Sequence, residues 1–468
     1  MNNLSKKIII FFLVSRAIMV LSGFRILVDY DYMHFHDINL LQHNFWETIF
    51  YTHSFTPWIN IFTGFVLQFP EYLHPFIYQV SFYGLSVTAL LMFSKLLKRL
   101  DISDKLTLGV VIFFSLTPPY IYFEHFYIYT FPAMAILLVA AESLMQAIDK
   151  DTFRSWLLFF TWCVLLSFVR TTFHLVWLIA ILGGVLLVQK KVNYKIIFAF
   201  LIPTAVLLLW YLKNLLLFGF FGISSWAGFN LSYITVRQLD DTQKTTLINE
   251  GIMSPLIKIS VHNSVQAYSE YVDIEEKTGI EVLDAIKRSN GQPNYNHKKF
   301  TELSKLKMKD NITYLKLYPK EYAFSVMKGF LKFFRPTSTW HPHDQTASPH
   351  LALRKKIGAW EKIYNTVFHS LPIKNVGLYT FFILLFIWLL ITYVKAIFRG
   401  KLFSSSDKLI AFTLMNIFFV ATLSCLVTST ELARYRFMIE PFIWILSVVY
   451  VSQGIKRYRN RLKGKVLA

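Results

Sequence analysis

The sequence predicts an all-α integral membrane protein with about ten transmembrane helices, a long first outer loop and a large outer domain between the seventh and eighth helices. Hydrophobic residues make up 54% of the 468 residues, and the mean hydropathy is +0.44. Charged residues account for 16%, whereas a soluble protein carries about 25%. Apolar runs long enough to cross a bilayer recur along the chain, and basic clusters separate them in a regular order.

The apolar runs give the expected transmembrane helices in chain order. A span needs roughly 20 predominantly apolar residues, so the third and fifth runs are short for this purpose. The runs cover residues 8–26, 76–94, 105–121, 127–147, 155–169, 174–189, 196–218, 374–394, 408–428 and 438–455.

Basic residues lie in every second connection between these runs, which predicts the topology. Because cytoplasmic connections are enriched in Lys and Arg, we expect both termini in the cytoplasm and the chain in the cell (inner) membrane. The same rule accounts for the formal net charge of +20. No basic patch with a nucleic-acid-binding motif occurs in the sequence, so nucleic acid is not an expected partner. The basic clusters are Lys6-Lys7, Lys95 with Lys98-Arg99, Lys150 with Arg154, Lys190-Lys191 with Lys195, Lys395 with Arg399 and Lys401, and Lys456 to Lys463.

The remaining five connections are then external. They cover residues 27–75, 121–127, 169–174, 219–373 and 429–437. We therefore expect an N-terminal transmembrane catalytic module, an extracytoplasmic domain, and C-terminal helices with a basic cytoplasmic tail, at 1–218, 219–373 and 374–468.

Ionisable residues gather in four of the external connections, close to predicted helix ends. Since these connections share one side of the membrane, we expect their side chains to converge there. A carboxylate among them could accept a proton, and Arg side chains could hold a phosphate through their planar fork. Each residue alone could equally be a solvated loop residue. The residues are Asp29, Asp31, Asp37, Glu47, His34, His36, His43, His53, Glu124, His125, Arg170, His174, Glu431, Arg434 and Arg436.

A metal site is a further hypothesis for the first loop. Asp29-Tyr30-Asp31 has the D-x-D pattern of some metal sites, but three-residue matches are common by chance. The histidines nearby lack H-E-x-x-H spacing. A divalent metal is therefore possible, and no metal ligand is assigned.

Several stretches resemble the C-type (GT-C) membrane glycosyltransferases, related to protein O-mannosyltransferases and aminoarabinose transferases. Thr56-Pro57 stands where that superfamily has a double proline. Further stretches resemble a bacterial-type branch of the superfamily. The stretches of the first kind are Asp37–Leu41, Trp46-Glu47, Tyr51–Pro57, Pro118–His125 and Glu431–Phe437 through Pro441; those of the second kind are Arg170–Trp177, Lys213-Asn214, Phe218-Gly219, Ser224–Gly228 and Gly291–His297.

The resemblance implies an inverting transfer from a polyprenyl-phosphate-linked sugar to a glycan, lipid or protein acceptor on the extracytoplasmic face. It places the general base at Asp37, with Asp31 as the alternative, and a second acidic position at Glu124. Donor-phosphate contacts are expected from Arg434 and Arg436, with weaker partners in Arg170, His174 and Lys213, and substrate-loop positions are His53, Pro57, Trp226 and Asn294.

Other functions and structural roles remain open at this point. A transporter or flippase of lipid-linked sugars would place ionisable groups near the bilayer midplane, whereas here they lie near helix ends. A polysaccharide polymerase or ligase would also act on lipid-linked sugars at the outer face. Asp37 could instead cap a loop helix, and Arg434 and Arg436 could anchor the chain at the interface.

The spacing of Arg434 and Arg436 leads to a conditional prediction. On a helix the two side chains would point roughly 200° apart. Arg434 would then pair with Glu431, three residues away, and Arg436 would be free. In an extended loop both would reach the phosphate.

Overall fold

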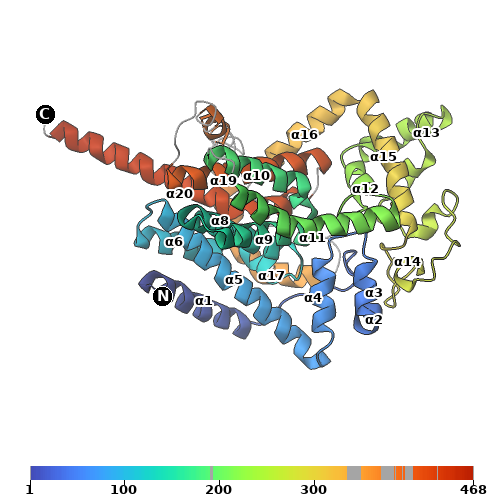
Figure 1. The fold of residues 1–468 in the computed structure, drawn as a ribbon, viewed down its shortest axis with the longest axis horizontal. Helices are drawn as coiled ribbons and strands as arrows, with labels where there is room; N and C mark the ends of the chain where they lie inside the picture. The colour runs from blue at the N-terminus through green and yellow to red at the C-terminus, as the bar shows by residue number, and fades with distance from the viewer. Residues whose placement is uncertain are drawn as a thin grey trace.

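The computed structural model describes residues 2–189, 193–334, 349–369, 384, 386–392, 394–395, 404–428 and 431–466. Within these ranges every regular element is a helix, and no β-strand occurs (Figure 1). The longer helices are α1 (Asn3–Leu21), α5 (His74–Arg99), α6 (Asp104–Ser115), α8 (Thr130–Lys150), α9 (Phe153–Val169), α10 (Leu175–Gln189), α11 (Tyr194–Phe218), α15 (Lys299–Leu317), α16 (Pro319–Phe333), α17 (Pro349–His369), α19 (Ser405–Val427) and α20 (Leu432–Val466).

Short helices and turns lie between the longer helices, most of them in the first and fourth connections. They are α2 (Ile38–His43), α3 (Phe45–Phe50), α4 (Trp58–Val66), α7 (Pro118–Glu124), α12 (Ala227–Ser232), α13 (Asp241–Asn249) and α14 (Glu281–Asp284), with 3₁₀ turns η1 (Glu71–Leu73), η2 (Thr171–Phe173), η3 (Val236–Gln238), η4 (Pro255–Lys258) and η5 (Val265–Tyr268).

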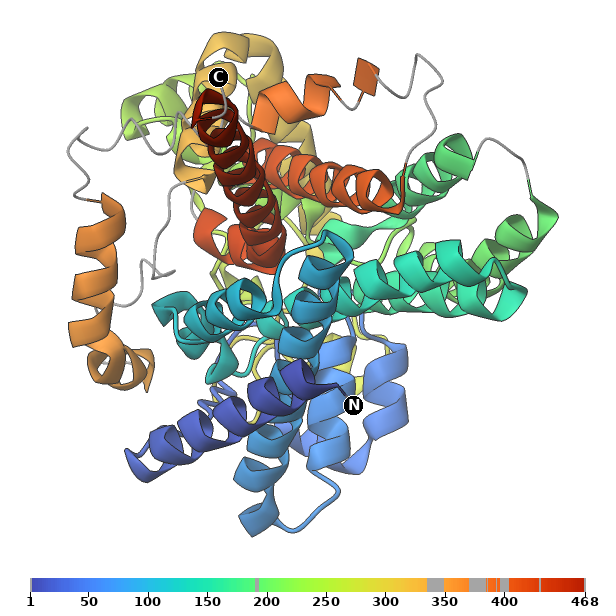
Figure 2. The ribbon, with the colours of Figure 1, turned by 90° about the vertical axis from the view of Figure 1, so that its left-hand side faces the viewer.

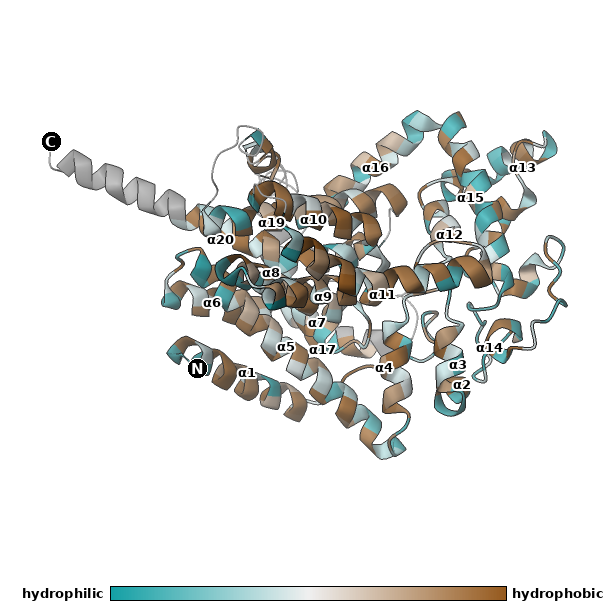
Figure 3. Ribbon diagram, viewed as in Figure 1, coloured by the Kyte–Doolittle hydropathy of each residue, from teal (hydrophilic) through white to brown (hydrophobic). Residues whose placement is uncertain are grey.

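Five described helices are long and apolar enough to cross a membrane, and α6 with α7 forms a sixth if this bent pair is one span. The five spans are Glu71–Arg99, Thr130–Lys150, Tyr194–Phe218, Ser405–Val427 and Leu432–Ser452; α9 and α10 are apolar but shorter. Apolar residues dominate these helices, whereas polar residues are concentrated on α13 to α15 (Figure 3). The prediction of an all-α membrane protein is therefore confirmed.

The bundle is arranged around α8, which packs against α5, α9 and α20. Ala133, Ala140 and Ala141 are fully buried on α8, and small residues let membrane helices approach closely. In contrast, α11 exposes Leu201, Val206 and many other large apolar side chains. Such a continuous exposed apolar face suits contact with lipid.

Two predicted boundaries differ from the structure. The predicted span 105–121 breaks into α6 and α7 with a 61° bend, because Pro118 and Pro119 begin α7 and the preceding Thr117 is extended. The predicted loop 429–437 is also wrong, since α20 begins at Leu432. Most of the predicted span 374–394 lies outside the described residues.

The short helices of the first and fourth connections lie together at one end of the bundle (Figure 1). The first and fourth connections share an apolar core that includes Phe55, Trp226 and Phe300. Both termini lie at the opposite end and face the viewer in Figure 2. Two helices of the segment 219–373 return to the bundle, since α16 packs on α19 and α20 and α17 packs on α7.

Candidate functional site: a cavity with two buried arginines

A polar cavity of about 70 Å³ lies where the short helices meet the bundle. We call it the cation cavity. Its walls come from four of the five connections that the sequence places on one side, and from Tyr129, the residue that precedes α8. The lining residues include Tyr32, His34 and Phe55 from the first connection, Tyr129 from the start of α8, Arg170 and Thr171, then Ser224, Trp226, Asn230, Tyr233 and His262 from the fourth, and Glu431, Arg434 and Tyr435 from the last.

Arg170 is the most informative residue of the cavity. It follows the last residue of α9 in an extended conformation, and it is only 6% exposed. Its guanidinium lies 4.3 Å from the ring centre of Tyr129 and 4.5 Å from that of Tyr435. Among the described residues no carboxylate lies within ion-pair distance of it, and its buried Nε has no hydrogen-bond partner. A buried cation without a counterion is costly, so this position favours an anionic ligand.

Arg434 lies beside it in the first turn of α20 and is 3% exposed. It donates a hydrogen bond to the hydroxyl of Tyr32 at 3.2 Å and forms an ion pair with Glu431. Its guanidinium is 5.2 Å from the ring centre of Tyr129, the ring that Arg170 also covers. The guanidinium groups of Arg170 and Arg434 thus both contact the ring of Tyr129. Glu431 contributes only a single negative charge beside their two positive charges.

His34 adds a neutral polar group to the same wall. Its Nε2 is hydrogen-bonded with the hydroxyl of Tyr129 at 3.2 Å, and its buried Nδ1 has no hydrogen-bond partner. Burial and the adjacent charges of Arg434 and Arg170 lower the pKa of His34 well below its usual value. The imidazole is therefore neutral at physiological pH and offers one further polar atom to a ligand.

A second, wider cavity of about 510 Å³ adjoins the first. We call it the apolar cleft. The two cavities share Thr171, Ser224, Asn230, Val427 and Tyr435. Apolar side chains from α10, α11, α12 and α19 and their connections dominate the cleft, among them Leu175, Val176, Tyr211, Ile223, Leu231 and Leu423. An amphiphilic anion, with its charge in one cavity and its chain in the other, fits this pair of cavities.

The predicted carboxylates of the first loop lie elsewhere. Asp37 caps α2, accepting from the backbone N–H of Asn39 at 2.8 Å and from the hydroxyl and backbone N–H of Ser289. Asp31 accepts from Asn290 at 2.8 Å. Neither lines the cation cavity. Asp37 therefore caps a loop helix, which was the alternative role considered for it from the sequence.

Glu124 is fully buried inside the bundle and does not line the cavity. Arg16 of α1 forms an ion pair with it at 2.9 Å and also donates to the carbonyl of Ser115 at 3.0 Å. Breaking a buried ion pair by removing one partner is costly. The arrangement gives Glu124 the role of fixing α1 to α7.

Arg436 faces away from Arg434. It is 5% exposed and pairs with Glu440 at 2.8 Å, one turn along α20. The segment is thus helical and not an extended loop. As predicted for a helix, Arg434 pairs with Glu431. The expectation that Arg436 would be free is wrong, because Glu440 occupies the i+4 position. Both side chains are buried, so neither is an interfacial anchor.

Of the weaker predicted phosphate contacts, Arg170 lines the cation cavity and His174 lines the apolar cleft. Lys213 does neither. It donates to the carbonyls of Phe50 and Thr52 at 2.8 Å each, and it lies 3.9 Å from the ring centre of Trp210. Lys213 thereby ties α11 to the first loop.

The predicted substrate-loop residues also separate. Trp226 lines the cation cavity and stacks on Phe229. Pro57 precedes the first residue of α4. Asn294 donates to the carbonyls of Val282 and Ala285 at 3.0 and 2.8 Å, so it organises its own loop.

His53 is fully buried and joins the first loop to the fourth connection. Its Nε2 donates to the carbonyl of Asn296 at 2.9 Å, and its Nδ1 accepts from the hydroxyl of Ser225 at 2.9 Å. Burial lowers the pKa of His53, and that of the nearby buried His36, to about 3.

These two histidines predict acid sensitivity. Between the unfolded pKa of about 6.5 and the folded value of about 3, the unfolded chain binds more protons, so the free energy of unfolding falls as pH is lowered. The slope reaches about 1.4 kcal/mol per pH unit for each histidine. We expect the thermal unfolding midpoint, followed by tryptophan fluorescence in detergent, to fall steeply below pH 6.5. His53→Asn should flatten this slope and exposed His43→Asn should not; equal slopes in all three proteins would contradict the assignment.

No group of three or more metal-ligating side chains occurs in the part of the chain that the structure describes. Among the residues that line the cation cavity, sequence reasoning missed Tyr32, Tyr129, Tyr233, His262 and Tyr435. Tyr435 could have been noticed, because it stands between the two predicted arginines. Tyr129 and His262 carry no local sequence signal, since only packing brings them to the cavity.

Comparison with known proteins identifies no relative of this chain. The chain matches no family model, and no curated protein and no solved structure is significantly similar to it. The membrane fold and the two adjoining cavities are therefore the features that bear on function.

Proposed function

We propose that this protein is a membrane glycosyltransferase that takes its sugar from a polyprenyl-phosphate-linked donor. The observation that carries the proposal is Arg170, a buried guanidinium without a carboxylate partner among the described residues, in a cavity that continues into an apolar cleft. A lipid-linked phosphate has the matching charge and the matching chain. The resemblance of the short motifs to GT-C enzymes supports the same substrate class.

In this proposal Arg170 and Arg434 hold the donor phosphate, and the polyprenyl chain lies along the apolar cleft. Arginine suits the task because its planar fork matches phosphate oxygens. The phosphate gains negative charge as the sugar leaves, so two guanidinium groups at that point stabilise the transition state. Both guanidinium groups are buried, and low local polarity strengthens their interaction with a phosphate.

We assign the general base to Glu431 and not to Asp37. Glu431 is the only carboxylate among the described residues that line the cation cavity, and its side chain is 29% exposed. The acceptor hydroxyl attacks the anomeric carbon and gives its proton to Glu431, while the bond from that carbon to the phosphate oxygen breaks. The polyprenyl phosphate leaves with the bonding electrons, and the transfer inverts the anomeric configuration.

The proposed membrane topology has about ten spans, both termini in the cytoplasm of the cell and the cation cavity on the extracytoplasmic side. In support, both termini lie at the end of the bundle opposite the short helices (Figure 1). We expect reporter fusions after Lys191 and after Arg459 to score cytoplasmic and a fusion at Gln292 to score external. A cytoplasmic score at Gln292 would reverse the membrane orientation and remove the extracytoplasmic site.

The function is tested with purified protein and a panel of radiolabelled polyprenyl-phosphate sugars. When a suitable acceptor fraction is added, the protein should transfer the labelled sugar to the acceptor and release free polyprenyl phosphate. Binding of the donor without bond cleavage, together with movement of the donor between leaflets of vesicles, would instead identify a flippase. Elongation of a lipid-linked glycan would identify a polymerase or ligase. Failure to bind any member of the panel would refute the phosphate site.

A further inference from the structure

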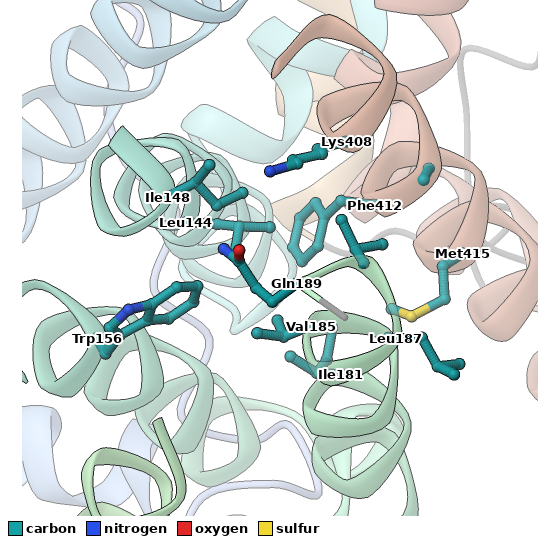
Figure 4. Close-up of a pocket in the computed structure, with 13 residues that line it drawn as sticks. Leu144, Ile148, Trp156, Ile181, Val185, Leu187, Gln189, Lys408, Phe412 and Met415 are labelled. Atoms are coloured by element: carbon teal, nitrogen blue, oxygen red, sulfur yellow. The ribbon is translucent and has the colours of Figure 1, made fainter. Parts of the chain in front are cut away.

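A separate cavity lies at the other end of the same helices. The cation cavity takes residues from the beginning of α8, the end of α9 and the region just beyond α19. This third cavity, of about 130 Å³, lies between the end of α8, the beginning of α9, the end of α10 and the beginning of α19. We call it the distal cavity (Figure 4).

The walls of the distal cavity are almost entirely hydrocarbon. Leu144, Ile148, Ile181, Val185, Leu187, Val188, Ala411, Phe412 and Met415 line it together with Trp156 and Gly184. The indole N–H of Trp156 donates to Asp151 at 2.9 Å, so this side chain presents carbon to the cavity. The interior therefore suits an alkyl chain and no polar ligand.

Two polar side chains break this apolar lining. Lys408 and Gln189 bring their polar ends among Leu144, Ile148 and Phe412 (Figure 4). Lys408 has no ion-pair partner among the described residues. A lone ammonium beside an apolar cavity is complementary to a molecule with one anionic group and an attached chain.

Further positive charge surrounds this end of the bundle. Lys150 ends α8 and Arg154 lies in the first turn of α9, while Lys195 in the first turn of α11 pairs with Asp151 at 3.7 Å. By the positive-inside rule this is the cytoplasmic end. The cytoplasmic leaflet is rich in anionic lipid, and basic pockets between membrane helices on that side bind anionic headgroups.

We propose that the distal cavity is a binding site for an anionic glycerophospholipid, with one acyl chain between α8, α10 and α19 and the phosphate on Lys408. The site is distinct from the donor site, because it lies at opposite ends of the same helices and shares no lining residue with it. A lipid held there joins α8 and α19, whose other ends reach the cation cavity, to α10, whose other end lines the apolar cleft.

The chain offers matched variants for a test. A Cβ at Gly184 meets no atom within 4 Å, and Gly184 lines the cavity, so Gly184→Phe should place its ring in the cavity. A Cβ at the neighbouring Gly183 is equally free, but Gly183 does not line the cavity, so Gly183→Phe is the control for Gly184→Phe. Lys408→Gln removes the charge at the cavity, and Lys105→Gln removes an exposed charge from α6 as its control.

The experiment measures the thermal unfolding midpoint of the full chain in nanodiscs of phosphatidylcholine with and without phosphatidylglycerol. A lipid that binds the folded state raises the midpoint. We expect phosphatidylglycerol to raise the midpoint of the wild type and of both controls, and Lys408→Gln and Gly184→Phe to lose most of this increase. Native mass spectrometry should show a retained phosphatidylglycerol in the wild type that Gly184→Phe lacks.

Each other outcome overturns the proposal. A full increase in both test variants would place the lipid effect elsewhere. Loss in Lys408→Gln alone would indicate attraction to surface charge without an inserted chain. Loss in Gly184→Phe alone would indicate a chain site without preference for an anionic headgroup. The measurements do not use the transferase activity, so they stand whether or not the proposed function holds.

Discussion

Replacement of Arg170 by glutamine should abolish high-affinity binding of a polyprenyl-phosphate donor. Arg170 is buried, lies between the rings of Tyr129 and Tyr435, and has no carboxylate partner among the described residues. Its charge is therefore free to act on a ligand. Loss of a hydrogen bond to a charged group costs about 1.5–3 kcal/mol, which corresponds to a decrease in affinity of roughly 10- to 100-fold. Equilibrium binding of a labelled donor measures this directly.

Two comparison variants make the result specific. Arg154→Gln removes an exposed arginine from the other end of the same helix, α9, and should bind donor as the wild type does. Arg434→Lys keeps the charge but loses the planar fork, so it should bind donor more weakly than the wild type. The wild-type protein should also gain thermal stability from the donor, and Arg170→Gln should not. Unchanged donor affinity in Arg170→Gln would exclude Arg170 from the phosphate site.

Replacement of Glu431 by glutamine should lower transfer by at least about a hundredfold, the scale of a lost general base. Glutamine has nearly the same shape but cannot accept the proton of the acceptor hydroxyl. The substitution also removes the counterion of Arg434, so donor affinity should be maintained or increased. A fall in turnover with unchanged or tighter donor binding is thus the expected signature. A purely structural role of Glu431 would weaken binding and turnover together.

The first-loop aspartates provide the competing hypothesis. Asp37→Asn keeps a side-chain oxygen that can still cap α2, so under our assignment it should retain most of its activity. Asp31→Asn should behave in the same way, since Asp31 lies against Asn290 outside the cation cavity. Collapse of turnover in Asp37→Asn or Asp31→Asn with normal folding, beside an active Glu431→Gln, would return the base to the first loop.

The sequence was sufficient for the fold class, and it indicated most of the connections that line the cation cavity. Hydropathy is a local property that can be summed along the chain, so the apolar runs coincide with α5, α8, α9, α10, α11 and α19. The alternation of basic clusters assigns five connections to one side, and residues from four of them line one cavity. Because every connection on one side of a bundle ends at the same face, this convergence needs no knowledge of the helix packing.

Local sequence predicted the directions of Arg434 and Arg436 only on the condition that the segment is helical. Helical geometry requires them to point in different directions, and the i+3 carboxylate of Glu431 is visible from the sequence. In the structure α20 begins at Leu432, six residues before the predicted span, so both arginines lie on a helix. The sequence prediction overlooked Glu440, four residues after Arg436, although its spacing is equally local.

Only the tertiary structure decided which ionisable residues face the cavity. Glu124 is paired with Arg16, which is 108 positions away in the chain, and Asp37 is bonded to Ser289, 252 positions away. Arg170, in contrast, packs between two tyrosines and has no carboxylate partner among the described residues. The physical reason is that the energy of a buried charge depends on the partners that packing brings to it, and sequence spacing does not contain those partners.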